Sequence, residues 1–195
     1  CSGNIQINDS LMIAGTEEKA LVTDIYAGDT NVSESSSGDS ITLVLDKDID
    51  ISRGDVLTNE NFKINKNKAY LSKLIWFDKD KCYPNRSFIL KTAHKTINCE
   101  LLKIKNKINI NTFGKGVAGY LNMNDIAEVE LLLDQESTIT PYAINKTLGN
   151  FILIDRKTNL TVAAGIIEHD LRRSTNVKWQ KTEINREARL KILDQ

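Results

Sequence analysis

The residues best suited to chemistry in this 195-residue chain begin with a glycine-rich run. Phe113-Gly114-Lys115-Gly116-Val117-Ala118-Gly119 contains Gly-x-Gly-x-x-Gly, which cradles a dinucleotide when a strand precedes it and a helix follows it. Here an Asn-rich stretch without helical period follows, so we interpret the run as a flexible loop. The sequence also lacks Gly-x-x-x-x-Gly-Lys-Ser/Thr, the loop that binds a triphosphate.

The two histidines are the next candidates. His94 lies near Cys82 and Cys99 in the sequence, but a zinc site needs three or four closely spaced ligands, and none is visible. We interpret His94 as a structural residue on a strand. His169-Asp170 imitates part of a catalytic dyad at the end of a strand, yet no nucleophile stands at a known spacing from it. We therefore predict no catalytic, cofactor-binding or metal-binding residue.

Other distinctive residues have structural explanations. Arg53-Gly54-Asp55 predicts a tight turn between two strands, and we give little weight to the adhesion function that this tripeptide suggests. Trp76 is expected in a core or at a barrel rim, and Trp179 is placed to anchor the tail onto another domain.

Composition narrows the class of protein. The net charge is zero and the pI is about 6.9, which argues against a nucleic-acid partner because such proteins carry excess Lys and Arg. Three cysteines without a Cys-x-x-Cys motif indicate a reducing, cytoplasmic setting. No apolar run reaches the length of a membrane helix, and no signal peptide is present. Because the chain lacks an initiator Met, we expect a fragment.

Apolar residues come in short bursts bounded by Gly, Asn, Asp or Ser, which predicts an all-β chain of barrels or sandwiches. The clearest unit is a hairpin, in which Phe151–Ile154 and Leu160–Ala164 flank the polar turn Asp155–Asn159. Gly149 and Gly165 are expected where a strand bends or approaches another backbone closely. The other predicted strands include 11–13, 20–22, 41–45, 71–77, 87–90 and 129–133.

These bursts predict three parts. Residues 1–62 hold few strands for a closed barrel, so this first domain is expected to be partial. Residues 68–171 are long enough to close into a barrel of their own. Residues 172–195 read as a linker followed by a short helix over 186–193, which is rich in helix formers. Because a partial barrel leaves strand edges open, self-association through the first domain is a further expectation.

The hairpin at 148–167 closely resembles the closing hairpin of the third domain in elongation-factor-Tu-like GTPases. Taken in order, several segments look like the large, GTPase-bearing subunit of bacterial sulfate adenylyltransferase, in the form fused to adenylylsulfate kinase. They are Ser2–Ile5 with Asn8-Asp9, Ser37–Leu45, Asp48–Asp55, Leu74–Trp76, Tyr83-Pro84, Lys91–Ala93, Leu121–Ala127 and the tail Asn176–Gln195.

This resemblance implies two elongation-factor-Tu-like β-barrels, the first truncated at its N-terminus, and a short C-terminal helix. It implies a parent that converts ATP and sulfate to adenylyl sulfate with GTP hydrolysis and then phosphorylates the product. GTP, ATP and Mg²⁺ would serve that parent, and none of their motifs maps onto residues 1–195. The implied partners are a small catalytic subunit and the parent's own GTPase and kinase domains, with no membrane. The alternative is the barrel pair of a translation factor that contacts tRNA.

Overall fold

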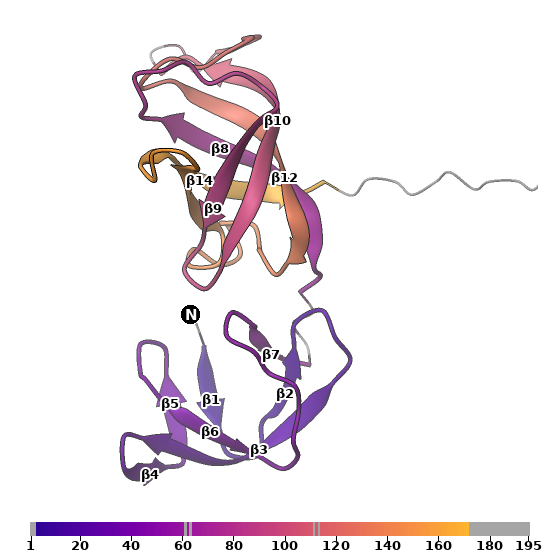
Figure 1. Cartoon of the computed structure of the whole chain (residues 1–195). Coiled ribbons are helices and arrows are strands. Elements are labelled where there is room, and N and C mark those ends of the chain that lie inside the picture. Colours follow the sequence, from indigo (N-terminus) through magenta and orange to yellow (C-terminus); the bar gives the residue numbers. More distant parts are fainter. Residues whose placement is uncertain (1–2, 61, 63, 111, 113, 172–195) are drawn as a thin grey trace, which may run out of the picture.

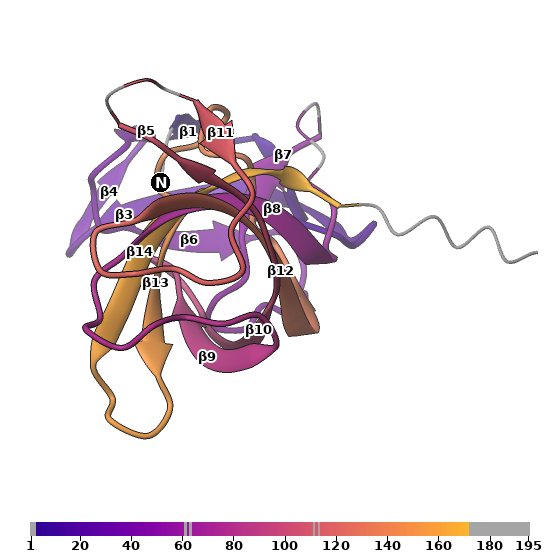
Figure 2. The same ribbon diagram turned by 90° about the horizontal axis from the view of Figure 1, so that it is seen from above.

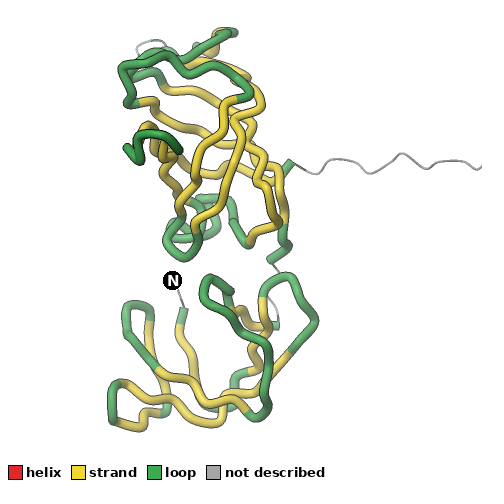
Figure 3. The backbone as a smooth tube through the Cα atoms, viewed as in Figure 1, coloured by secondary structure: helices red, strands yellow, loops and turns green. Residues whose placement is uncertain are grey.

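The computed structural model describes residues 3–60, 62, 64–110, 112 and 114–171, and these form an all-β structure without a helix (Figures 1 and 3). The all-β prediction is confirmed, and each predicted burst overlaps a strand. The strands are β1 Asn4–Gln6, β2 Ser10–Ile13, β3 Lys19–Ala27, β4 Thr30–Val32, β5 Glu34–Ser36, β6 Thr42–Leu45, β7 Leu57–Asn59, β8 Asn67–Trp76, β9 Arg86–Lys91, β10 Thr96–Ile108, β11 Lys115–Gly116, β12 Ile126–Ser137, β13 Asn150–Asp155 and β14 Thr161–Asp170.

Six antiparallel strands of the C-terminal half close into a barrel. The order is β10-β12-β8-β14-β13-β9, and β9 pairs again with β10, which completes the cylinder. Closure leaves none of the six strands with an open edge, so neighbouring strands satisfy the backbone groups of each. The two-residue strand β11 lies outside this cylinder and pairs with the end of β10.

Alternating apolar side chains fill the barrel. Trp76, Phe88, Leu101 and Leu153 are fully buried, and they come from four different strands. In β10 every second residue up to Leu101 is buried, and the next buried residue is Ile104, three positions later. The reason is a register shift against β12 after Leu101, which turns Ile104 to the same inner face. The barrel core therefore consists of side chains at alternate positions of the strands, and this alternation shifts by one residue at a β-bulge.

The predicted hairpin is confirmed as β13 and β14, with Phe151 opposite Gly165. Both glycines stand where the notional Cβ of another residue would meet backbone. A Cβ on Gly165 would lie 2.5 Å from the Lys73 carbonyl oxygen on β8, and one on Gly149 would meet Tyr142 N at 2.5 Å. Close approach of another backbone is thus the reason for glycine at each position.

Asp155 organises the turn of this hairpin. Its Oδ1 accepts hydrogen bonds from the backbone N–H groups of Lys157 and Thr158, both at 2.9 Å, and its Oδ2 accepts one from Arg86 Nη2 at 2.7 Å. These bonds hold the pKa of the Asp155 carboxyl well below its usual range, with the backbone bonds contributing most. The turn is therefore also linked to β9, the strand next to β13.

We expect the free energy of unfolding of Asp155→Asn to depend less on pH in the acid range than that of the wild type does. A depressed carboxyl pKa contributes stability that is present above the unfolded pKa, about 3.9, and is lost as the pH falls through the lower folded value. The variant should be less stable than wild type at pH 7, and the gap should shrink below pH 4. Urea midpoints at pH 7 and pH 3 measure this. The exposed Asp48→Asn is the control, and an equal gap at both pH values would contradict the prediction.

The N-terminal half does not close. One sheet has the order β4-β3-β2-β7 with β6 paired to β3, and β1 pairs only with β5 in a separate ribbon (Figure 1). Its core is small, since Leu11, Val22 and Ile25 are buried and their apolar neighbours are only partly covered. A cavity lies between the β1–β5 ribbon and strands β2 and β7.

The N-terminal half and the barrel lie end to end in Figure 1, and they overlap in the view from above in Figure 2. Two small contacts join them. Ala14, Ile64 and Leu148 form a separate buried cluster with Val56 packed against it. The turn at Gly54 approaches the β9–β10 turn, where a Cβ on Gly54 would lie 3.2 Å from the His94 carbonyl oxygen. One rim of the barrel, formed by the β9–β10 turn and the β12–β13 loop, therefore faces the N-terminal half.

Several predictions concern residues outside the described range. The linker, the helix over 186–193, Trp179 and Cys1 all lie there. Within the described range, no helix has the length and apolar character needed to cross a membrane.

Candidate functional site

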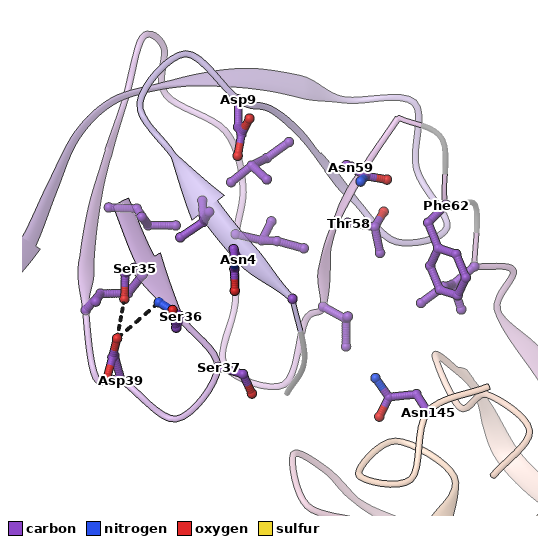
Figure 4. Close-up of a pocket in the computed structure, with 18 of the residues that line it drawn as sticks. Asn4, Asp9, Ser35, Ser36, Ser37, Asp39, Thr58, Asn59, Phe62 and Asn145 are labelled. Carbon is purple, nitrogen blue, oxygen red and sulfur yellow. Dashed lines mark hydrogen bonds between the residues drawn. The ribbon is translucent and has the colours of Figure 1, made fainter. Parts of the chain in front are cut away.

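A crevice of about 850 Å³ lies between the open N-terminal half and the barrel (Figure 4). Its walls come from the β1–β5 ribbon, from β2 and β7, and from the β12–β13 loop. The apolar lining includes Ile5, Leu11, Leu43, Leu57 and Leu148, and polar groups stand around it. No short motif could have revealed this site, because its walls come from segments far apart in the sequence.

Three carboxylates line the crevice, and each is bound by neighbouring groups. Asp9 Oδ2 accepts a hydrogen bond from the Gln6 backbone N–H at 2.8 Å. Asp39 accepts hydrogen bonds from Ser35 Oγ at 2.9 Å and from the Ser36 backbone N–H at 3.1 Å, and these lower its pKa. Glu60 accepts a hydrogen bond from Ser10 Oγ at 2.7 Å and pairs with Lys19 at 3.2 Å, which lowers its pKa. Asp39 and Glu60 are therefore held in the charged form.

This arrangement suits binding rather than catalysis. A general acid or base works best with a pKa near neutrality, whereas Asp39 and Glu60 are shifted away from it. Among the described residues that line the crevice, none is a histidine or a cysteine. Among the described residues, no group of three His, Cys, Asp or Glu side chains could hold a metal ion. The crevice can bury apolar side chains of a ligand, and the polar groups around it can accept hydrogen bonds.

The glycine-rich run forms part of the barrel's exterior. Lys115–Gly116 is the short strand β11, so the prediction of a loop throughout is wrong at these two residues. Lys115 Nζ donates to Glu128 Oε1 at 2.5 Å, and this bond with that from Asn106 holds the pKa of Glu128 low. The Lys115–Glu128 ion pair therefore links the glycine-rich run to β12. Phe113 lies outside the described residues.

The histidines and cysteines are not brought together. His94 lies in the β9–β10 turn rather than on a strand, which corrects the prediction, while Cys82 lies in the loop at the opposite end of β9. Burial raises the pKa of both the Cys82 and the Cys99 thiol to about 12, so both stay protonated. His169 lies within β14, and the neighbouring Asp170 accepts a hydrogen bond from Asn67 Nδ2 at 3.0 Å.

The Arg53-Gly54-Asp55 tight turn is confirmed. Gly54 has a φ of +100°, and the Asp55 N–H donates to the Ser52 carbonyl oxygen at 3.0 Å. The turn packs toward the β9–β10 turn, so its place is at the junction of the two halves. Trp76 is confirmed as a core residue: it is fully buried, and its ring meets Phe88 edge-on with centroids 5.7 Å apart.

Curated relatives match nearly the whole chain. "Bifunctional enzyme NodQ" of Rhizobium sp. (strain BR816) is 33% identical over 96% of this chain and 30% of its own length. "Bifunctional enzyme CysN/CysC" of Xylella fastidiosa is 32% identical over 100% of this chain and 31% of its own length. "Sulfate adenylyltransferase subunit 1" of Saccharophagus degradans is 31% identical over 91% of this chain and 38% of its own length. The chain thus spans about a third of these relatives.

The fold has known neighbours too. A solved structure of sup35 with GDP superposes with a TM-score of 0.74 at 21% identity, covering 87% of this chain and 42% of that one. This likeness confirms the elongation-factor-Tu-like architecture. The family model described as GTP-eEF1A C-terminal domain-like matches residues 69–168, which run from β8 to near the end of β14. The chain, homologous to sulfate adenylyltransferase subunit 1 and its bifunctional counterparts, therefore belongs to the GTP-eEF1A C-terminal domain-like family.

Proposed function

We propose that this chain is the non-catalytic β-barrel segment of a sulfate-activating enzyme and serves it as a scaffold and docking surface. The observation that carries the proposal is the similarity over nearly the whole chain to proteins named for sulfate adenylyltransferase and its bifunctional forms. The parent reaction would form adenylyl sulfate and pyrophosphate from ATP and sulfate, driven by GTP hydrolysis. A fused kinase would then phosphorylate adenylyl sulfate.

The structure supports a scaffold role on physical grounds. A closed six-stranded barrel is a rigid body, and rigid bodies can hold partner surfaces in fixed geometry and transmit the movement of an attached domain. The carboxylates of the crevice are engaged within the chain. GTP, ATP and Mg²⁺ would therefore act on other domains of the parent, and the partners would be the small subunit and the GTPase and kinase domains.

The test is binding to the small subunit of sulfate adenylyltransferase from the same organism. We expect the purified 195-residue chain to form a complex with it in sedimentation experiments at micromolar concentration. The chain alone should show no sulfate-dependent exchange of pyrophosphate into ATP. Absence of a complex, or exchange by the chain alone, would contradict the proposal.

A second candidate is the barrel pair of a translation factor, which the likeness to sup35 and the family match favour. Contact with tRNA needs a basic surface, because phosphate neutralisation supplies most of the affinity. The zero net charge of this chain makes that candidate the weaker one. Binding of tRNA at 50 mM salt that weakens steeply as salt is added would favour the translation factor.

A further inference from the structure

The barrel has a second rim, opposite the one that faces the N-terminal half. Strands β8 and β13 end there and β9, β12 and β14 begin there, so three connections meet: 77–85, 117–125 and 156–160. We call the surface of these three loops the distal surface. In Figure 1 the connections 77–85 and 117–125 lie at the end of the barrel farther from the N-terminal strands, and the β13–β14 turn projects from its side.

The distal surface exposes an unusual share of apolar side chains. Half of the large apolar side chains that the described residues expose lie on these three loops, although the loops form a small part of the chain. Tyr83 is 54% exposed and Met123 is 50% exposed. Exposed apolar groups concentrated on a few loops are typical of interaction sites in soluble proteins. The six residues are Phe77, Tyr83, Val117, Tyr120, Met123 and Leu160.

Backbone hydrogen bonds hold this surface in a fixed shape. Cys82 and Leu121 form an antiparallel bridge in which each N–H donates to the other's carbonyl oxygen, at 3.0 and 2.9 Å. The Asn124 N–H donates to the Trp76 carbonyl oxygen at 2.7 Å, and the Phe77 N–H donates to that of Val162 at 2.8 Å. The side chains therefore stand on a preorganised frame, which lowers the ordering cost of binding.

The side chains themselves indicate the class of partner. The Tyr83 and Tyr120 rings are in contact, with centroids 5.8 Å apart, and Lys81 Nζ lies 4.2 Å from the Tyr120 centroid. Because Lys81 lies over one face of the Tyr120 ring and three of the six exposed groups are not aromatic, the surface is poorly suited to stacking nucleic-acid bases. Exposed Tyr and Met are instead typical of protein interfaces.

The charges on the distal surface are complementary to an acidic partner. The loops carry the exposed cations Lys79, Lys81, Arg156 and Lys157. Against these four stand Asp78 and Asp80, while the carboxylate of Asp125 is already paired with Lys107 at 2.6 Å. The excess is two positive charges around an apolar centre, on a chain whose net charge is zero. A partner with apolar side chains flanked by carboxylates fits this pattern.

We propose that the distal surface is a protein-docking site whose occupant is an apolar patch with acidic flanks on the small subunit of sulfate adenylyltransferase. This inference rests on the proposed function and adds to it the face of the barrel that is used. Tyr83 and Tyr120 form the centre of the contact, and the lysines of loop 77–85 pair with carboxylates at its edge.

The experiment compares three variants of the 195-residue chain with wild type, by titration against that purified small subunit. Tyr83→Ala/Tyr120→Ala removes the central rings, and we expect binding at least 10-fold weaker. Lys79→Glu/Lys81→Glu reverses the edge charges, and we expect a similar loss that shrinks at high salt. The control is Leu21→Ala, which removes a similarly exposed apolar side chain from β3 in the N-terminal half and should bind as wild type does. Thermal midpoints confirm that each variant is folded.

The outcomes separate the two proposals. A wild-type chain that forms no complex overturns both. A wild-type complex that the tyrosine variant forms equally well overturns only the distal surface. A labelled single-stranded RNA that binds wild type and not the tyrosine variant would also overturn it, because the surface would then serve nucleic acid.

Discussion

Gly165→Ala should strongly destabilise the closed barrel. A methyl group at this position would lie 2.5 Å from the Lys73 carbonyl oxygen and 2.6 Å from Phe151 Cζ, with Leu74 Cβ at 2.9 Å. All three neighbours belong to the barrel wall, and the carbonyl is backbone, so it cannot turn away as a flexible side chain does. We expect a loss of roughly 3 kcal/mol or more, the upper range for overpacking a close-packed interior. That is a large fraction of a typical domain's stability.

The measurement is equilibrium unfolding in urea, followed by tryptophan fluorescence because Trp76 lies in the affected barrel. Gly116→Ala is the matched control, since nothing lies within 4 Å of the added methyl group. We expect it to change stability by no more than about 0.5 kcal/mol. A Gly165→Ala protein as stable as the control would show that β8 and β14 separate easily, contrary to the register found here.

Trp76→Ala is the second large effect, with an expected loss of about 3–5 kcal/mol. Three contributions combine: a large cavity in a fully buried site, the lost edge-to-face contact with Phe88, and the lost bond from Trp76 Nε1 to the Asp80 carbonyl oxygen at 2.8 Å. That bond also holds loop 77–85, so the loss should extend to the distal surface and weaken binding to the small subunit.

Two comparisons isolate these contributions. Phe77→Ala removes the next side chain on the chain, which is 41% exposed, and should cost far less stability. Trp76→Phe keeps an apolar ring but has no N–H for the Asp80 carbonyl, and should fall between wild type and alanine. Urea unfolding of all three variants checks this order. A Trp76→Ala protein no less stable than Phe77→Ala would refute the assignment of Trp76 to the core.

The hairpin shows what could be predicted from local pattern. Phe151–Ile154 and Leu160–Ala164 are short apolar runs, and the polar residues between them favour a turn, so β13 and β14 are correctly predicted. Close backbone approaches were also expected at Gly149 and Gly165. Gly149 approaches the nearby Tyr142, but the backbone that Gly165 approaches belongs to Lys73, about 90 residues away in the chain. His94 shows the limit: the residues around it favour a strand, yet β9 and β10 turn at this point.

The sequence by itself determined an all-β chain, its strand-forming segments and its likeness to the elongation-factor-Tu-like barrels, because these follow from residue types at short spacing. Only the tertiary structure decided that β9 pairs with both β10 and β13 to close the barrel, that the N-terminal half leaves a crevice, and that three loops share one apolar rim. The physical reason is that pairing register and rim position depend on contacts between distant segments. No local pattern of residues specifies those contacts.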